Sequence, residues 1–195
     1  MRWGGLGLVL LLAGCPIDRN GDGVVRVLCL GDSNTAVTGT LTKWCEYTAA
    51  QFGPPWAFVN RALIATATDP VLAQSAVDET HPDMVLIAWG TNDVRADYFD
   101  KTAEETTADL LALRQALLDQ HLGVLLALIP PQFGVYAANE STLELVNAQL
   151  RAAIPAAGLL DFWTGFGLAD FPDGLHCTDT AQHRRADLTR QALLR

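Results

Sequence analysis

Hydrophobic residues cluster in short runs along this chain, and longer mixed segments separate the runs. The runs at residues 27–30, 84–89 and 124–129 are apolar throughout, and each is followed directly by glycine or proline. Runs without polar alternation are typical of parallel strands that are buried on both faces. Five strands are predicted, over residues 27–30, 56–60, 84–89, 124–129 and 158–162.

The segments between these runs carry apolar residues at helical spacing. Residues 102–120 place Leu110, Leu113 and Leu117 on one stripe, as in a helix that packs on a sheet. Because strands alternate with helices, we expect an α/β fold with a parallel sheet, helices on both faces and right-handed crossovers. The predicted helices cover residues 42–53, 69–80, 102–120, 141–154 and 178–194.

Polar side chains follow the first three predicted strands. Ser33 follows the first strand, Asn60 ends the second and Asn92 follows the third. The carboxyl ends of parallel strands lie along one edge of a sheet, so these side chains can converge there. Ser33 is a potential nucleophile, but a serine hydroxyl needs a base, an orienting acid and donors that stabilise an oxyanion.

The length and charge of the chain limit its class. A chain of 195 residues, half of them hydrophobic, is long enough for one domain with a substantial core. Its formal net charge of −9 argues against nucleic acid or an anionic membrane surface as the main partner.

The first residues resemble a bacterial lipoprotein signal. Arg2 precedes an apolar run at residues 6–12 that is too short to span a bilayer but suits a signal peptide. Residues 12–15 resemble the lipobox, in which the cysteine is diacylated and becomes the mature N-terminus. We expect a signal peptide over residues 1–14, a lipidated Cys15, a tether over 15–24 and a domain over 25–195. This places the protein in the bacterial cell envelope, lipid-anchored and facing the periplasm or the exterior; the alternative is an ordinary secretory signal with an incidental cysteine.

Two patterns suggest metals, and we favour neither. Residues 18–23 imitate the start of a calcium loop, but the twelfth position, where a glutamate is required, is Cys29. His176, Cys177 and His183 lack a recognisable zinc spacing. We expect no metal and no cofactor.

Four sequence blocks resemble the SGNH (GDSL) hydrolase family. They are Gly-Asp-Ser at 31–33, Asn-Arg-Ala at 60–62 with Ala65, Gly-Thr-Asn-Asp at 90–93 and Asp-Gly-Leu-His at 173–176. The blocks occur in the order of the family and cover nearly all of the mature chain. The resemblance implies a flavodoxin-like three-layer α/β/α sandwich and hydrolysis of esters.

The resemblance also implies a role for each residue. Ser33 attacks the ester carbonyl, His176 takes and returns the proton, and Asp173 orients the imidazole. The oxyanion is held by the Ser33 backbone N–H, the Asn92 amide and one further backbone N–H. The family usually has glycine at that last position, where this chain has Ala65. We therefore expect a tighter oxyanion hole, with a weakened site as the alternative.

Three functions fit this pattern. We favour a serine esterase that acts on small esters and removes short acyl groups, such as acetyl, from carbohydrate or lipid. The alternatives are a lysophospholipase or thioesterase, and a surface-anchored binding protein with a disabled site. Among the aromatic residues, Trp163, Phe166 and Phe171 are candidates for an acyl pocket. The natural substrate and the oligomeric state do not follow from the sequence.

Export would place the remaining cysteines in a compartment that permits disulfides. Cys29 lies in the first predicted strand, so we expect it to be a buried, unpaired thiol. Cys45 and Cys177 should both lie near the active site. We expect unpaired thiols there, with a Cys45–Cys177 bridge as the alternative.

Overall fold

The computed structural model describes residues 18–37 and 41–195. Cys15 and the predicted signal peptide lie outside these residues. Five parallel strands form one sheet in the order β2-β1-β3-β4-β5. The strands are β1 (Val25–Gly31), β2 (Trp56–Asn60), β3 (Met84–Ala88), β4 (Gly123–Ala127) and β5 (Leu159–Leu160).

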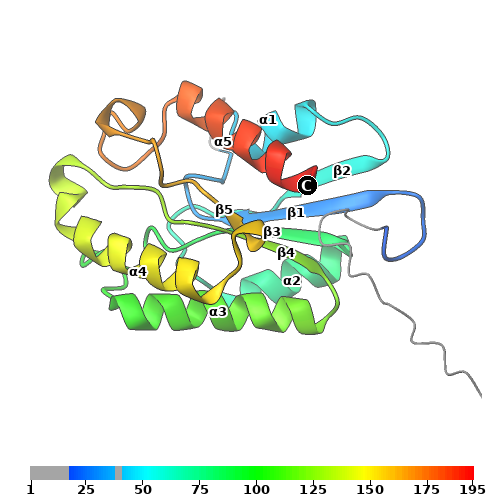
Figure 1. Ribbon diagram of the computed structural model, residues 1–195, viewed down its shortest axis with the longest axis horizontal. Coiled ribbons are helices and arrows are strands. Elements are labelled where there is room, and N and C mark those ends of the chain that lie inside the picture. Colours follow the sequence, from blue (N-terminus) through cyan, green and yellow to red (C-terminus); the bar gives the residue numbers. More distant parts are fainter. Residues whose placement is uncertain (1–17, 38–40) are drawn as a thin grey trace, which may run out of the picture.

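Helices cover both faces of this sheet. Figure 1 shows α1 and α5 on one face and α2, α3 and α4 on the other, which confirms the predicted three-layer α/β/α sandwich. The helices are α1 (Trp44–Ala50), α2 (Pro70–Thr80), α3 (Ala103–Asp119), α4 (Glu140–Ala153) and α5 (Asp179–Leu193). Three short 3₁₀ helices complete the chain: η1 (Gly134–Asn139), η2 (Ala156–Gly158) and η3 (Leu168–Asp170).

Side-chain oxygens define where three of the helices begin. Asp69, Thr102 and Thr178 are the N-caps of α2, α3 and α5, and each accepts hydrogen bonds from backbone N–H groups of the first turn. These starts agree with the predicted ones. Helix α1 differs, because Lys43 is its N-cap in place of Thr42 and the helix ends before the predicted Gly53.

Strand β1 supplies buried side chains to both layers. Leu28 and Leu30 belong to the core formed with α2, α3 and α4, whereas Val27 and Cys29 belong to the core formed with α1 and α5. All four are almost fully buried. Successive side chains of a strand point to opposite faces, so a strand covered on both faces has no solvent-facing position for a polar residue.

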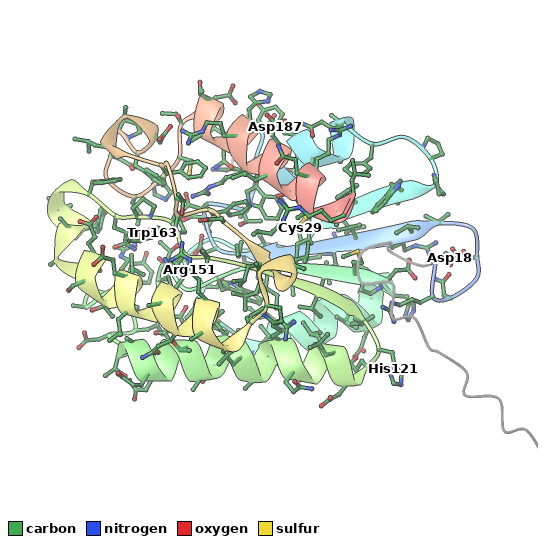
Figure 2. All side chains as sticks on the ribbon, viewed as in Figure 1. Asp18, Cys29, His121, Arg151, Trp163 and Asp187 are labelled. Atoms are coloured by element: carbon green, nitrogen blue, oxygen red, sulfur yellow. A yellow bond between two sulfur atoms is a disulfide. The ribbon has the colours of Figure 1, made fainter. Side chains whose placement is uncertain are left out.

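A disulfide joins Cys29 of β1 to Cys45 in the first turn of α1, with a Cα–Cα distance of 6.4 Å. Cys29, labelled in Figure 2, lies in the layer between the sheet and α1. The expectation of unpaired thiols was wrong for Cys29 and Cys45, and so was the alternative bridge between Cys45 and Cys177. Cys29 is buried, as predicted. Because its side chain points to the face of the sheet that α1 covers, its sulfur lies beside that of Cys45. Cys177 is a free thiol, and burial raises its pKa to about 11.

The acids of the loop before β1 form hydrogen bonds and an ion pair within the loop and with β1. Both carboxylate oxygens of Asp18 accept backbone N–H groups of residues 21–23, and Asp22 pairs with Arg26. Figure 2 shows Asp18 at the opposite end of the strands from the loops that follow β1 and β3. Within the described ranges, no group of three metal-ligating side chains is present and no helix is long and apolar enough to cross a membrane.

The disulfide leads to a test of the fold. Breaking it with Cys45→Ala should lower the free energy of unfolding by about 3 kcal/mol, because the bridge closes a short loop in the unfolded chain. Chemical denaturation with and without reductant measures this difference, and Cys177→Ala serves as the control that keeps the bridge. Alkylation of the unfolded, non-reduced protein should label Cys177 and neither Cys29 nor Cys45. Label on Cys29 and Cys45 would contradict the pairing.

Candidate active site

The site lies at the topological switch point of the sheet, between β1 and β3. β1 and β3 are neighbours, with Gly31 paired to Ala88, but the chain leaves β1 for β2 on one side and β3 for β4 on the other. Crevices outside the carboxyl ends of strands form at such a switch point. The turn after β1 carries Ser33, and the turn after β3 carries Asn92.

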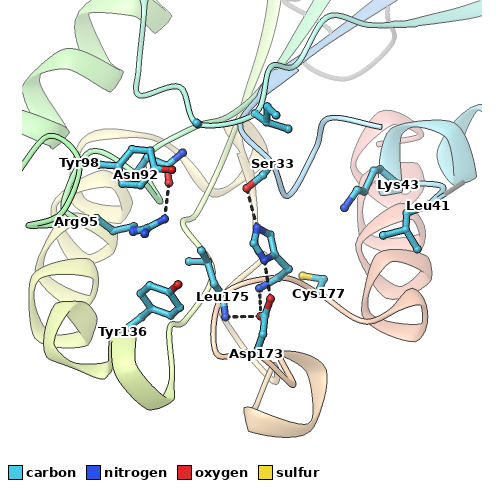
Figure 3. A pocket seen from close by; sticks show the side chains of 13 residues that line it. Ser33, Leu41, Lys43, Asn92, Arg95, Tyr98, Tyr136, Asp173, Leu175 and Cys177 are labelled. Atoms are coloured by element: carbon cyan, nitrogen blue, oxygen red, sulfur yellow. Dashed lines mark hydrogen bonds and ion pairs between the residues drawn. The ribbon is translucent and has the colours of Figure 1, made fainter. Parts of the chain in front are cut away.

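Three side chains form a hydrogen-bonded chain at this crevice (Figure 3). Ser33 Oγ lies 3.0 Å from His176 Nε2, although the two residues are 143 positions apart in the sequence. His176 Nδ1 lies 2.7 Å from Asp173 Oδ2. The structure thus brings together the predicted nucleophile, base and orienting acid in the order that nucleophilic catalysis requires.

Asp173 holds both the ring of His176 and its loop. Its Oδ1 accepts the backbone N–H groups of Leu175 at 2.9 Å and His176 at 2.7 Å. Partial burial by itself would raise the pKa of Asp173. The hydrogen bonds from the backbone and ring of His176 outweigh that effect and lower the pKa, so the carboxylate stays ionised beside the imidazole.

The turn between Asp173 and His176 depends on Gly174. Its φ is +82°, and a Cβ at this position would lie 2.3 Å from the backbone oxygen of Phe133. The backbone oxygen of Gly174 also accepts the N–H of Phe133 at 2.8 Å. A side chain here would push the His176 loop away from residue 133, so glycine is required at this position.

Asn34 joins the turn after β1 to the His176 loop. Its Nδ2 donates to the backbone oxygen of Leu175 at 3.2 Å, and its Oδ1 accepts the N–H of Cys177 at 3.3 Å. The backbone oxygen of Asn34 in turn accepts from Gln182 Nε2 at 3.2 Å. Sequence analysis missed Asn34 and Gln182. The one signal available was that Asn34 directly follows the nucleophile and has an amide that can donate and accept at once.

The buried carboxylate of Asp32 shapes the turn that presents Ser33. Its Oδ1 accepts the N–H of Asn34 at 2.9 Å, and its backbone oxygen accepts those of Thr35 and Ala36 at 2.9 and 2.8 Å. Burial raises the pKa of Asp32 to about 6. The Asp32 side chain is fully buried and does not line the cavity, so it supports the turn from behind.

The amide of Asn92 is held in one orientation. Its Nδ2 donates to the backbone oxygen of Thr66 at 2.9 Å, and its Oδ1 accepts from Arg95 Nη1 at 3.3 Å. A guanidinium only donates, so this contact requires the amide oxygen to face Arg95. One N–H of Nδ2 then remains for a ligand in the cavity.

Arg95 is itself fixed from several sides, and sequence analysis also missed it. Its guanidinium pairs with Asp97 and lies over the rings of Tyr98 and Tyr136, with 4.3 and 4.8 Å to the ring centroids. Only 6% of the residue is exposed. Arg95 therefore positions Asn92 rather than offering a free charge.

Ala65 has the backbone conformation that a glycine would adopt most easily. Its φ is +58°, in the left-handed region, where a residue with a Cβ has a cost of roughly 1–2 kcal/mol. Ala65 lines the same cavity as Ser33 and Asn92. Its N–H forms no hydrogen bond with the described residues. Ala65 therefore adopts, at some cost in backbone strain, a conformation that glycine adopts freely, at the position where the resemblance implies glycine.

One cavity of about 560 Å³ is lined by Ser33, Ala65, Asn92, Arg95, Asp173 and His176, among others (Figure 3). The three aromatic candidates for an acyl pocket are not in it, so that expectation was wrong. Phe166 and Phe171 pack in the core around the buried Arg185, and Trp163 packs against the core of the α2, α3 and α4 layer. The aromatic side chains of the cavity are Tyr98 and Tyr136.

Comparisons with known proteins agree with this geometry. Residues 29–189 match the model of the GDSL-like Lipase/Acylhydrolase family. No curated protein matches the chain in sequence.

Among solved structures, the native aryl esterase of M. smegmatis is similar, with a TM-score of 0.73 and 20% identity over 86% of this chain and 97% of that chain. A GDSL-like lipase from Bacteroides thetaiotaomicron has a TM-score of 0.72 and 18% identity over 86% of this chain and 87% of that one. A carbohydrate acetylesterase family member from Sinorhizobium meliloti has a TM-score of 0.69 and 15% identity, covering 87% and 99%.

The structural likenesses show the fold, and the family model covers most of the sequence. The chain therefore belongs to the GDSL-like lipase/acylhydrolase family and is an ester hydrolase.

Proposed function

We propose that this protein is a serine esterase that hydrolyses short-chain carboxylic esters through an acyl-enzyme. The observation that carries the proposal is the chain of hydrogen bonds from Ser33 through His176 to Asp173, at the wall of a cavity that Asn92 and Ala65 also line. Cofactor and metal play no part in the proposed steps.

In the proposed reaction, Ser33 Oγ attacks the ester carbonyl while His176 Nε2 takes its proton. The oxyanion that forms accepts hydrogen bonds from the Asn92 amide and from the backbone N–H groups of Ser33 and Ala65. His176 then returns the proton to the leaving alcohol. Water repeats the sequence on the acyl-enzyme, and the ionised Asp173 stabilises the charged imidazole in both halves.

The character of the cavity favours a short acyl group. Besides the apolar side chains of Leu41, Ile64 and Leu175, the cavity is lined by the polar or charged side chains of Lys43, Arg95, Asn92, Asp173 and His176. A long aliphatic chain laid along these groups would remove them from water without offering hydrogen bonds in return. Two structural neighbours carry the names aryl esterase and carbohydrate acetylesterase family member, and small esters of this kind suit the cavity. A lysophospholipase, a thioesterase and a catalytically weakened, surface-anchored binding protein remain outcomes of the test below.

The proposed location is the bacterial cell envelope. It rests on the sequence of residues 1–15 alone, with Cys15 as the acylated N-terminus of the mature chain. Two acyl chains on that residue would anchor the domain stably at a membrane surface.

The nucleophile is tested with 4-nitrophenyl esters of increasing chain length. The wild-type protein should hydrolyse the acetate and butyrate faster than the long-chain esters, and Ser33→Ala should lower kcat by at least about 10⁴-fold. Ser75→Ala, on the exposed face of α2, is the matched control. Preference for long chains would favour a lipase-type substrate, and no turnover by the wild type would favour a binding protein. Wild-type turnover in the Ser33→Ala protein would contradict the mechanism.

The oxyanion role of Asn92 predicts a specific kinetic signature. Asn92→Ala removes one donor that acts on charge in the transition state, so kcat should fall by ~10²–10³-fold with little change in KM. Steady-state kinetics on 4-nitrophenyl acetate measures both constants. A change confined to KM would instead assign Asn92 to binding of the ground state.

The backbone role of Ala65 is tested with substitutions that differ in how readily they adopt a positive φ. Ala65→Gly should keep kcat near the wild-type value, because glycine adopts a φ of +58° freely. Ala65→Val should lower kcat by ~10²-fold, the loss expected for one oxyanion donor, since a β-branched residue disfavours this conformation. Equal kcat for the valine and glycine variants, in proteins of equal melting temperature, would exclude residue 65 from the oxyanion hole.

A further inference from the structure

The ammonium group of Lys43 lies in the cavity and has no hydrogen-bond or ion-pair partner among the residues that the structure describes. Lys43 is the N-cap of α1, only 4% of the residue is exposed, and its side chain lines the same cavity as Ser33. Its backbone N–H donates to Glu46 Oε2 at 3.3 Å. Its Nζ, by contrast, forms no hydrogen bond or ion pair with any described residue, and Figure 3 shows the amine directed into the cavity.

The other charged groups of the cavity are already compensated. Asp173 pairs with His176, and the Arg95 guanidinium pairs with Asp97 and donates to Asn92. Lys43 is the remaining charge, and within the described part of the cavity wall nothing neutralises it.

Burial is the main influence on this lysine. It lowers the pKa of Lys43. The charges of Cys177, Asp32 and Glu46 oppose this effect, and the charge of Arg185 adds to it. A buried ammonium without a partner is costly, and an anion that enters the cavity would supply the missing partner. The overall charge of −9 does not itself attract anions, so any preference for them would be local to this residue.

The position of Lys43 relative to Ser33 indicates which part of a bound ester its side chain would contact. In Figure 3, Lys43 and Asn92 lie on opposite sides of Ser33, with Cys177 next to Lys43 and directly after His176 in the chain. When the oxyanion points toward Asn92, the leaving oxygen must lie near His176 Nε2, which returns the proton to it. An alcohol part that extends from this oxygen away from Asn92 would reach the side of the cavity where Lys43 lies.

We propose that Lys43 binds an anionic group, carboxylate or phosphate, on the alcohol part of the ester. The substrate class would then be short-chain esters of acidic alcohols, such as acylated acidic sugars or acylated phosphate-bearing headgroups. This inference rests on the proposed esterase function and narrows its substrate. Lys43 acts in it as a specificity residue, because it contacts the leaving group and not the reacting carbonyl.

The test compares aryl acetates that differ in one substituent on the alcohol part. The probes are 4-carboxyphenyl acetate, 4-acetoxyphenyl phosphate and the neutral 4-carbamoylphenyl acetate. The readout is the ratio of kcat/KM for each anionic ester to that for the neutral one, so that differences in intrinsic reactivity cancel between variants. The carboxylate and phosphate arms separate the two sources of the anion, and a preference for either supports the proposal.

Lys43→Gln should lower this ratio by about tenfold or more, the effect of losing one charge-assisted hydrogen bond. Lys43→Arg should restore most of it. Arg190→Gln removes the same charge from the exposed face of α5 and should leave the ratio unchanged. A ratio that is the same in wild type, Lys43→Gln and Lys43→Arg would overturn the proposal.

A failure of the esterase function would look different. In that case the wild type would hydrolyse none of the three esters, and the Ser33→Ala protein would give the same background rate. Calorimetric titration of the wild type with 4-carboxyphenyl acetate and its carbamoyl analogue then tests whether Lys43 binds an anionic group. Tighter binding of the anion that is lost in Lys43→Gln supports the anion site, and equal binding of both probes rejects it.

Discussion

The site depends on contact between two loops that are far apart in the sequence. The turn after β1 carries the proposed nucleophile, Ser33, and the loop at residues 173–177 carries the proposed base, His176. Asn34 links them through both ends of its amide, and the carboxylate of Asp173 fixes the base within its own loop. These supporting contacts place Ser33 Oγ and His176 Nε2 within hydrogen-bond distance. The hydrogen bond between them is therefore not the only contact that holds the two loops together.

A second set of constraints acts on the opposite wall of the cavity. The amide of Asn92 is oriented by Thr66 and by Arg95, which is in turn held by an ion pair and two aromatic rings. Ala65 has a left-handed backbone that costs stability, and its N–H has no hydrogen-bond partner in the described ranges of the chain. Donors fixed before the reaction can stabilise developing charge without first having to reorganise. In the proposed mechanism, one wall of the cavity transfers the proton and the other stabilises the developing charge.

Much of the fold could be predicted from the sequence, because burial on both faces removes polar residues from parallel strands. The strands at residues 84–88 and 123–127 and the helix starts at Asp69, Thr102 and Thr178 are examples. Ser33 and Asn92 could be predicted as site residues because each follows a predicted strand, whereas His176 was predicted from the resemblance of its block to the SGNH family. The fold brings all three together.

Contacts across layers could not be predicted in the same way. The disulfide between Cys29 and Cys45 depends on which face of β1 is covered by α1, and period-two alternation does not specify that face. The roles of Asn34 and Arg95 depend on the direction of single side chains. Phe166 and Phe171 precede the catalytic loop in sequence, but they pack around Arg185 in the core. Proximity in sequence was therefore a poor guide to the lining of the cavity.

The central claim is that Ser33 is activated by His176 within this constellation. Labelling the native protein with a serine-reactive phosphonate and locating the adduct by peptide mass spectrometry tests it directly. We expect one adduct, on Ser33, which does not form when His176 is replaced by alanine. An adduct on another serine, or hydrolysis that continues after complete labelling of Ser33, would contradict the claim.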